Sequence, residues 1–195
     1  MNNKINFNFL GIDEVGRGSW SGPVVACAVK LNPDILDNKL YLKIDDSKKI
    51  SKSRREKLFE YIKKHSKYSF GISSVEEIDK FNIMKATELA IKRAYDYFSK
   101  DNLDIKIDGP NFFFLNEKTE FIIKGDEKVI NISAASILAK VFRDKHMASL
   151  SLNFPEYGWE KNSGYGTKDH LKAIEFYGIT KHHRKSFKPI KNIIF

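Results

Sequence analysis

The sequence has almost no cysteine, little proline and no long apolar run. One cysteine in 195 residues excludes a disulfide framework, and the five prolines are scattered rather than gathered into a linker. No stretch approaches the roughly 18 to 20 consecutive apolar residues that a membrane-spanning helix needs. We therefore expect an ordinary globular protein with no membrane partner.

The first ten residues also lack the pattern of a secretory leader. They combine neither a strongly basic start nor a continuous apolar segment, so we expect a cytoplasmic location. The single Cys27 lies in the apolar run of residues 23–29. A small buried side chain is the favoured interpretation of a cysteine in such a run.

Positive charge is in excess. The chain has 34 Lys and Arg residues against 25 Asp and Glu residues, a formal net charge of +9. Such an excess favours a polyanionic partner such as nucleic acid. Charge alone is weak evidence, because many lysine-rich proteins bind nothing specific, so the motifs must decide.

The spacing of apolar residues predicts strands that alternate with helices. The expected strands are residues 9–13, 24–31, 68–73, 103–107 and 121–123. The expected helices are residues 53–65, which begin with a capping-box spacing at Ser53, and residues 83–98, 132–150 and 168–177. This order implies an α/β fold with a mixed β-sheet flanked by helices. We divide the chain into a main domain, residues 1–150, and a small C-terminal helical extension, residues 151–195, that packs on it as a cap.

Four acidic residues share one context, because each lies at or just past a predicted strand end next to a glycine turn. They are Asp13, Glu14, Asp108 and Asp126. Brought together, these carboxylates would repel one another unless cations neutralised them, and oxygen ligands in that number suit Mg²⁺ or Mn²⁺. Two such ions, about 3.5 to 4 Å apart, would support phosphodiester cleavage. Ordinary turn residues are the alternative, and any one of the acids alone would favour it.

Asp13 and Glu14 pose a geometric difficulty because they are neighbours in sequence. Adjacent side chains of a regular strand point to opposite faces of the sheet, so the two cannot both face one metal pair on a regular strand. We therefore expect the strand to break at Glu14. Gly16 and Gly18 supply the flexible backbone for such a break.

A second group of residues suits contact with a sugar or a phosphate. The candidates are Gly16, Arg17, Gly18, Lys48, Lys49 and Tyr165. The amides and guanidinium of residues 16–18 could meet a phosphate or a sugar, and the two lysines could contact phosphates. A tyrosine between two glycines could stack on a base or sugar. A simple turn, solvated lysines and a buried tyrosine are the respective alternatives.

Residues 182–185 read His-His-Arg-Lys. They could contribute to a zinc site, but no further cluster of His or Cys accompanies them. We expect a solvated basic loop and assign no metal to it.

Several short motifs together resemble the signature blocks of the ribonuclease HII family, in the same order and with matching spacing. They are Gly-Ile-Asp-Glu-Val-Gly-Arg-Gly at residues 11–18, Asp-Ser-Lys-Lys at 46–49, Ile-Asp-Gly at 107–109, Lys-Gly-Asp at 124–126, Ala-Ala-Ser-Ile-Leu-Ala-Lys-Val at 134–141 and His-Arg-Lys-Ser-Phe at 183–187. Each block alone is unspecific, but jointly they are highly specific.

The resemblance implies an RNase H-like fold and an endonuclease that uses Mg²⁺ or Mn²⁺. Its expected substrates are RNA–DNA hybrids, in which it would hydrolyse the RNA strand, and duplex DNA with single embedded ribonucleotides, which it would nick on the 5′ side during ribonucleotide excision repair. The products would be 3′-hydroxyl and 5′-phosphate ends. By position, the four carboxylates match the family's metal ligands, residues 16–18 its motif for the 2′-hydroxyl, and Tyr165 its tyrosine at the junction of ribonucleotide and deoxyribonucleotide. We expect a monomer.

The chain departs from the family pattern at a few positions. The family usually has Pro and Leu where this chain has Ser19 and Trp20, and often has Lys where this chain has Ser163. Asp144 also matches a family acid, but one helical turn separates it from Lys140, so we expect a structural ion pair.

Two rival functions remain for the structure and experiment to address. A noncatalytic duplex-binding protein on the same fold would explain the basic charge equally well, although the intact carboxylate set argues against it. A two-metal nuclease that cuts plain DNA would not need the glycine-rich and tyrosine motifs.

Overall fold

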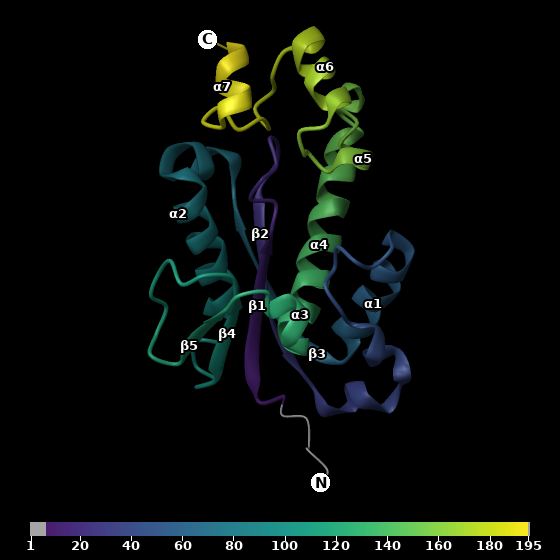
Figure 1. Ribbon diagram of the computed structural model, residues 1–195, viewed down its shortest axis with the longest axis vertical. Helices are drawn as coiled ribbons and strands as arrows, with labels where there is room; N and C mark the ends of the chain where they lie inside the picture. Colours follow the sequence, from purple (N-terminus) through teal and green to yellow (C-terminus); the bar gives the residue numbers. More distant parts are fainter. Residues whose placement is uncertain (1–6, 195) are drawn as a thin grey trace.

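The computed structural model describes residues 7–194 and shows one mixed five-stranded sheet (Figure 1). The strands are β1 (Phe9–Val15), β2 (Val24–Leu31), β3 (Ser66–Ser73), β4 (Asp104–Asp108) and β5 (Thr119–Ile122). Their order across the sheet is β3-β2-β1-β4-β5. β1 lies at the centre, antiparallel to β2 and parallel to β4. The predicted α/β class with a mixed sheet is confirmed.

Four long helices lie close to their predicted ranges. They are α1 (Lys52–Lys64), α2 (Val75–Asp96), α4 (Ile130–Ser151) and α6 (Lys168–Tyr177). Shorter helical segments, which the apolar spacing did not predict, are η1 (Pro33–Asp37), η2 (Lys39–Lys43), α3 (Gly125–Lys128), η3 (Pro155–Tyr157), α5 (Trp159–Asn162) and α7 (Lys188–Ile194). Segments of three to seven residues are too short to show a helical period, so they escape this kind of prediction.

The start of two helices differs from the prediction. No capping box forms at Ser53, because α1 begins at Lys52 and its N-cap, Ser51, makes no side-chain cap bond. The capping box lies at α2 instead, where Ser74 Oγ accepts a bond from the amide of Glu77 and the Glu77 carboxylate accepts one from the amide of Ser74. This cap satisfies two free amides at the helix start. It places the start of α2 at Val75, eight residues before the predicted Ile83, but α2 is kinked at Asn82, whose φ of +70° is not helical. Helical geometry resumes at the predicted Ile83, where Asn82 Oδ1 accepts from the amides of Met84 and Lys85.

Helices cover both faces of the sheet, with α2 on one face and α1 and α4 on the other (Figure 1). Alternate residues of β2 enter the two cores: Val25 and Cys27 pack with α1 and α4, while Val24 and Ala26 pack with α2. The expectation that Cys27 is buried is confirmed. Such alternation is the ordinary consequence of the two-residue period of a strand.

Two glycines allow the helices to approach the sheet closely. A Cβ atom at Gly71 would lie 1.9 Å from the carbonyl oxygen of Ala90 in α2, and one at Gly11 would lie 2.3 Å from the carbonyl carbon of Asn131 in α4. Neither helix could keep its position against a larger residue. The close approach of α4 matters most for function, because α4 runs beside the end of β1.

The C-terminal segment packs on the end of α4. A third apolar cluster joins Met147 of α4 to Trp159 and Ile174, with Trp20 packed against it. α4 continues to Ser151, so the expected boundary after residue 150 falls within its last turn. The division into a main domain and a helical extension stays a prediction.

The helices within residues 7–194 offer no segment that combines the length and apolar character of a membrane span. The expected lack of a secretory leader concerns the first ten residues, of which 1–6 lie outside the described part of the chain.

Candidate active site

The first strand does not break at Glu14, so that prediction is wrong. Its pairing with β2 runs regularly through Asp13 opposite Cys27, Glu14 opposite Ala26 and Val15 opposite Val25. The ladder of backbone hydrogen bonds to β2 keeps the strand straight. The turn begins only at Gly16, whose φ of +94° suits glycine.

Asp13 and Glu14 nevertheless line one pocket. The parallel pairing of β1 with β4 ends at Ile12 opposite Ile107, so β1 has an open edge beyond that point. A side chain at such an edge can approach the pocket from either face of the strand. The role of Glu14 must be revised accordingly: it reaches the pocket around the open edge of β1, not through a break in the strand.

The other two acids come from the neighbouring part of the sheet. Asp108 is the last residue of β4, and its Oδ1 accepts a hydrogen bond of 2.6 Å from the amide of Gly125. Asp126 follows in the first turn of the short α3 and not in the strand end itself. Its Oδ2 lies 3.7 Å from Lys48 Nζ. The turn after β5 therefore brings Asp126 toward Asp108.

The four carboxylates influence one another electrostatically. Burial raises the pKa of Asp13 well above its ordinary value, and the charges of Glu14 and Asp108 raise it further. Burial also raises the pKa of Glu14, against the effect of the Arg17 guanidinium, which lies 3.1 Å from Glu14 Oε1. For Asp126, burial raises the pKa first and the charge of Asp108 adds to it. Such mutual repulsion is a cost that a cation would relieve.

A divalent cation fits the chemistry of this carboxylate set. Glu14 Oε2 is buried and has no hydrogen-bond partner, which is costly for a carboxylate oxygen. Oxygen ligands of this kind suit Mg²⁺ or Mn²⁺. Within residues 7–194, however, no three His, Cys, Asp or Glu side chains are gathered as a ready-made metal site. Glu14, Asp108 and Asp126 point instead to Arg17, the Gly125 amide and Lys48.

The two predicted lysines differ in position. Lys48 lines the carboxylate pocket. Its turn is held by Asp46, whose Oδ1 accepts a 2.9 Å bond from the Lys48 amide. Lys49 Nζ lies 3.2 Å from Glu127 Oε1, away from the pocket lining. Only Lys48 is thus placed beside the acids.

Two residues of α4 line the same pocket, and the sequence did not single them out as site residues. They are Ser136 and Lys140. Ser136 Oγ lies 3.0 Å from Ser47 Oγ and its hydroxyl also lowers the pKa of Asp13. Ser136 lies in a run of small residues, Ser133 to Ser136 and Ala139, that suits close packing of α4 on the sheet. The same small side chains let α4 approach the acids.

Tyr165 also lines the carboxylate pocket and is half-buried, so neither full burial nor free exposure describes it. Its ring lies 5.8 Å from Lys140 Nζ and 5.7 Å from the guanidinium carbon of Arg143. A Cβ atom at Gly166 would lie 2.1 Å from the ring of Trp20. Gly166 therefore lets the loop of residues 163–167, which we call the tyrosine loop, pack against Trp20 in the segment that follows residues 16–18.

Two fully buried arginines hold the loops around the pocket. Arg143 donates to the carbonyls of Pro23, Ser21 and Ser163 at 2.8 to 2.9 Å. Arg184 donates twice to the carbonyl of Gly22 and once, at 3.0 Å, to that of Arg17. Neither guanidinium forms an ion pair with a carboxylate of the described residues. The two arginines thus join the residue 16–23 turn to the tyrosine loop.

The expectation of a solvated basic loop at residues 182–185 is wrong for its central pair. His183 is 1% exposed and Arg184 is 0% exposed. Burial lowers the pKa of His183 to about 3 and that of Arg184 to about 9. His183 Nε2 lies 3.2 Å from His170 Nε2. Sequence alone could not show that this segment crosses a buried interface.

His170 links this buried segment to Tyr165. Trp159 Nε1 donates to His170 Nε2 at 3.2 Å, so Nε2 acts as an acceptor and the ring proton lies on Nδ1. Nδ1 then donates to the Tyr165 carbonyl at 2.9 Å. Burial lowers the pKa of His170, which favours this neutral form.

Asp144 forms the ion pair expected of it. Its Oδ1 lies 2.8 Å from Lys140 Nζ and also accepts a 2.8 Å bond from Ser163 Oγ. Ser163, one of the departures from the family pattern, therefore anchors the start of the tyrosine loop.

Comparison with known proteins gives a consistent result. A family model described as Ribonuclease HII matches residues 10–190. A curated relative from Pelagibacter ubique, named Ribonuclease HII, is 52% identical over 185 residues, which are 94% of this chain and 97% of the relative.

Two solved structures have the same fold. The RNase HII of Archaeoglobus fulgidus, solved in a complex with PCNA, has a TM-score of 0.74 and 27% identity, with 92% of this chain and 94% of that chain covered. Bst-RNase HIII, solved in complex with Mn²⁺, has a TM-score of 0.73 and 17% identity, with 96% of this chain and 70% of that chain covered. The RNase H-like fold is confirmed.

Replacement of Asp13 by Asn should stabilise the protein at pH 7 without divalent cations. The raised pKa of Asp13 means that the folded state prefers the protonated acid, so ionisation costs stability as pH rises above the ordinary carboxyl pKa. We expect a gain of about 1 to 3 kcal/mol at pH 7 that vanishes near pH 3.5, measured by urea denaturation with a chelator. Asp104→Asn, at the exposed start of β4, should change stability at neither pH. A destabilised Asp13→Asn at pH 7 would contradict the argument.

Replacement of Arg143 by Met should destabilise the fold strongly. Three buried carbonyls, of Ser21, Pro23 and Ser163, would lose their donor. We expect the free energy of unfolding to fall by about 3 to 5 kcal/mol. Arg54→Met, at an exposed position of α1, should change it by less than about 0.5 kcal/mol. Equal losses in the two variants would show that the buried bonds contribute little.

Proposed function

The chain belongs to the ribonuclease HII family, and we propose that it cuts RNA within duplex DNA at the pocket that Asp13 and Glu14 line, together with the nearby Asp108 and Asp126. As a member of that family it is a ribonuclease H, an endonuclease. The observation that supports the location is the proximity of Asp108 to the other three acids, because its charge raises the pKa values of Asp13, Glu14 and Asp126.

Divalent cations, which we propose to be Mg²⁺ or Mn²⁺, would be held by the four carboxylates and would supply an activated water and charge stabilisation for the leaving oxygen. The rest of the chemistry falls to the chain's own residues. Lys48 and Lys140, both in the pocket lining, are placed to hold the negatively charged scissile phosphate. The Ser136 hydroxyl lowers the pKa of Asp13 and so would favour its ionised, ligand form.

Hydrolysis at this site would break the bond between phosphorus and the 3′-oxygen on the 5′ side of a ribonucleotide. The water oxygen would form the new bond to phosphorus, and the 3′-oxygen would leave and take up a proton. The products would be a 3′-hydroxyl and a 5′-phosphate. We propose RNA–DNA hybrids and duplex DNA with single ribonucleotides as substrates, a role in ribonucleotide excision repair, and a monomer as the active form.

Selection for a ribose would depend on two loops on either side of the pocket. The loop of residues 16–18 carries Arg17, whose backbone carbonyl is fixed by Arg184. The opposite loop carries Tyr165, whose ring borders the acids and whose carbonyl is fixed by His170. A 2′-hydroxyl is the group that distinguishes RNA from DNA at one sugar. Two rigid loops facing the same sugar could therefore recognise it by hydrogen bonding and stacking.

The activity is tested most directly by nicking of a DNA duplex that contains one ribonucleotide. With Mg²⁺ or Mn²⁺ we expect a single nick on the 5′ side of that residue and no nick in an all-DNA duplex. Asp108→Asn should lower the rate by at least about 100-fold, because even outer-shell changes at metal sites cost about 10- to 100-fold. Asp104→Asn, at the exposed opposite end of β4, is the matched control and should nick normally.

Two outcomes would contradict this function. Binding of the duplex without nicking in either metal would favour a noncatalytic binding protein. Equal cutting of the all-DNA duplex would favour a nuclease without sugar selection.

Tyr165 allows a separate test of sugar selection. Tyr165→Ala removes the ring and should lower kcat/KM on the single-ribonucleotide duplex by roughly 10- to 100-fold, in line with stacking energies of about 1 to 3 kcal/mol. Tyr165→Phe keeps the ring and should retain more of the activity. Tyr177→Ala, which removes an exposed tyrosine at the end of α6, should act like the wild type. Identical kinetics for the Phe and Ala variants would argue against stacking.

A further inference from the structure

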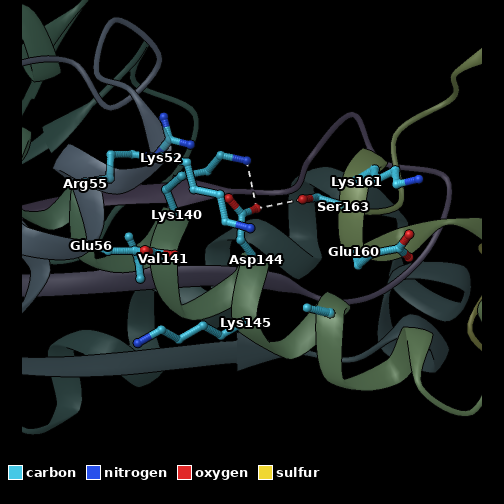
Figure 2. Close-up of a pocket in the computed structure, with 11 residues that line it drawn as sticks. Lys52, Arg55, Glu56, Lys140, Val141, Asp144, Lys145, Glu160, Lys161 and Ser163 are labelled. Carbon is cyan, nitrogen blue, oxygen red and sulfur yellow. Dashed lines mark hydrogen bonds and ion pairs between the residues drawn. The ribbon is translucent and has the colours of Figure 1, made fainter.

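A second pocket lies along α4, next to the carboxylate pocket and on the same side of the sheet. It has a volume of about 200 Å³. Three elements contribute to it: Lys52 and Arg55 come from α1, Lys145 comes from α4, and Lys161 comes from α5. Figure 2 shows these side chains around Asp144, with those of α1 on one side and Lys161 on the other. We call this the α1–α4–α5 pocket.

Positive charge dominates the α1–α4–α5 pocket. Its lining has five basic and three acidic side chains. One of the acids, Asp144, is paired with Lys140 at 2.8 Å, and a second, Glu160, accepts a hydrogen bond from Ser151. Four cations therefore face only two further acids.

None of the four cations forms a salt bridge with a carboxylate of residues 7–194, although the charge of Lys161 lowers the pKa of Glu160. Arg55 Nη1 donates to the carbonyl of Ser47 at 2.8 Å and to that of Ile50, which fixes the guanidinium without neutralising it. Lys145 Nζ lies 4.8 Å from the centre of the Phe59 ring. Lys52 and Lys161 form no salt bridge and are exposed. A cluster of this kind attracts an anion and repels a metal ion.

The position of the pocket indicates which anion it takes. Lys140 lines both this pocket and the carboxylate pocket, so the two are adjacent. From Ser136 to Asp144 there are eight residues of α4, which is about 12 Å along the helix axis. In a duplex that distance corresponds to roughly three to four steps of about 3.4 Å. A duplex with its scissile phosphate at the acids would bring another backbone phosphate to the α1–α4–α5 pocket.

We propose that the α1–α4–α5 pocket binds one backbone phosphate of the substrate duplex, about three to four steps from the cut. This inference rests on the proposed function, because it takes the carboxylate pocket as the place of cleavage. Arg55 is held in place and would form the fixed part of the site. Lys52 and Lys161 would close on the phosphate from opposite sides.

The test combines substrates in which one phosphate has been made neutral with a variant in which two lysines are replaced by glutamine. Duplexes with one ribonucleotide would carry a single methylphosphonate at successive linkages of either strand, and their affinity would be measured by fluorescence anisotropy without divalent cations. For the wild type, we expect one or two neighbouring linkages at which the neutral group weakens binding by about 3- to 10-fold, the range of one or two lost phosphate contacts. For the double variant Lys52→Gln, Lys161→Gln, the same linkages should have less than about a 2-fold effect.

Salt dependence supplies an independent readout. In the Lys52→Gln, Lys161→Gln variant, one phosphate contact is lost. The slope of log affinity against log salt concentration should therefore be less steep by about 1 than in the wild type. The matched control is Lys39→Gln, Lys100→Gln, which removes two exposed lysines that line neither pocket. It should keep the wild-type methylphosphonate profile.

Several results would overturn the phosphate site. These are a wild-type methylphosphonate profile in the Lys52, Lys161 variant, an equal loss of affinity at every linkage, or the same change in the control variant. Because binding is measured without nicking, a chain that binds in this pattern but never nicks would contradict the proposed activity and leave the phosphate site supported. A chain that nicks normally but shows no sensitive linkage would support the proposed activity and contradict the phosphate site.

Discussion

The arrangement of the candidate site depends on the hydrogen bonds of one buried group, the guanidinium of Arg143. It bonds only to main-chain carbonyls, two from residues 21 and 23 and one from Ser163. A buried charge without a counter-ion is costly unless every donor is bonded. Burial accordingly lowers the pKa of Arg143. That cost is offset only while both loops stay in place, so the loops are held together as one unit beside the acids.

Arg184 and the His170–His183 pair extend this unit to the C-terminal segment. Arg184 fixes the carbonyls of Arg17 and Gly22, and His170 fixes that of Tyr165. The segment after α6 therefore helps to support both the turn of residues 16–18 and the loop of Tyr165. The carboxylates have the opposite effect, because burial first and neighbouring negative charges second disfavour their ionised forms. Stabilising and destabilising groups are thus separated in space: the arginines and histidines hold the loops in place, and the buried acids lie between them at a cost in stability.

Much of the fold followed from periodicity. Five strands and four long helices lie near their predicted positions because each is long enough to show its period of 2 or 3.6 residues. The short helices did not follow from it. The break at Glu14 was wrong because a local rule about adjacent side chains was applied without knowledge that β4 stops at Asp108 and leaves the edge of β1 open. The loop at residues 182–185 was wrong because charge alone does not reveal a buried guanidinium whose partners are carbonyls.

The sequence by itself determined the chemistry available to this protein: the acids, the glycine-rich turn and the tyrosine, in an order and spacing that matched one family. Those features are local or are visible as short motifs. Only the tertiary structure decided which of them meet. It placed Lys48 at the acids and Lys49 away from them. It also brought Ser136 and Lys140 into the pocket and lined up four unpaired cations along α1, α4 and α5. The physical reason is that such contacts join residues far apart in the chain, and no local pattern records them.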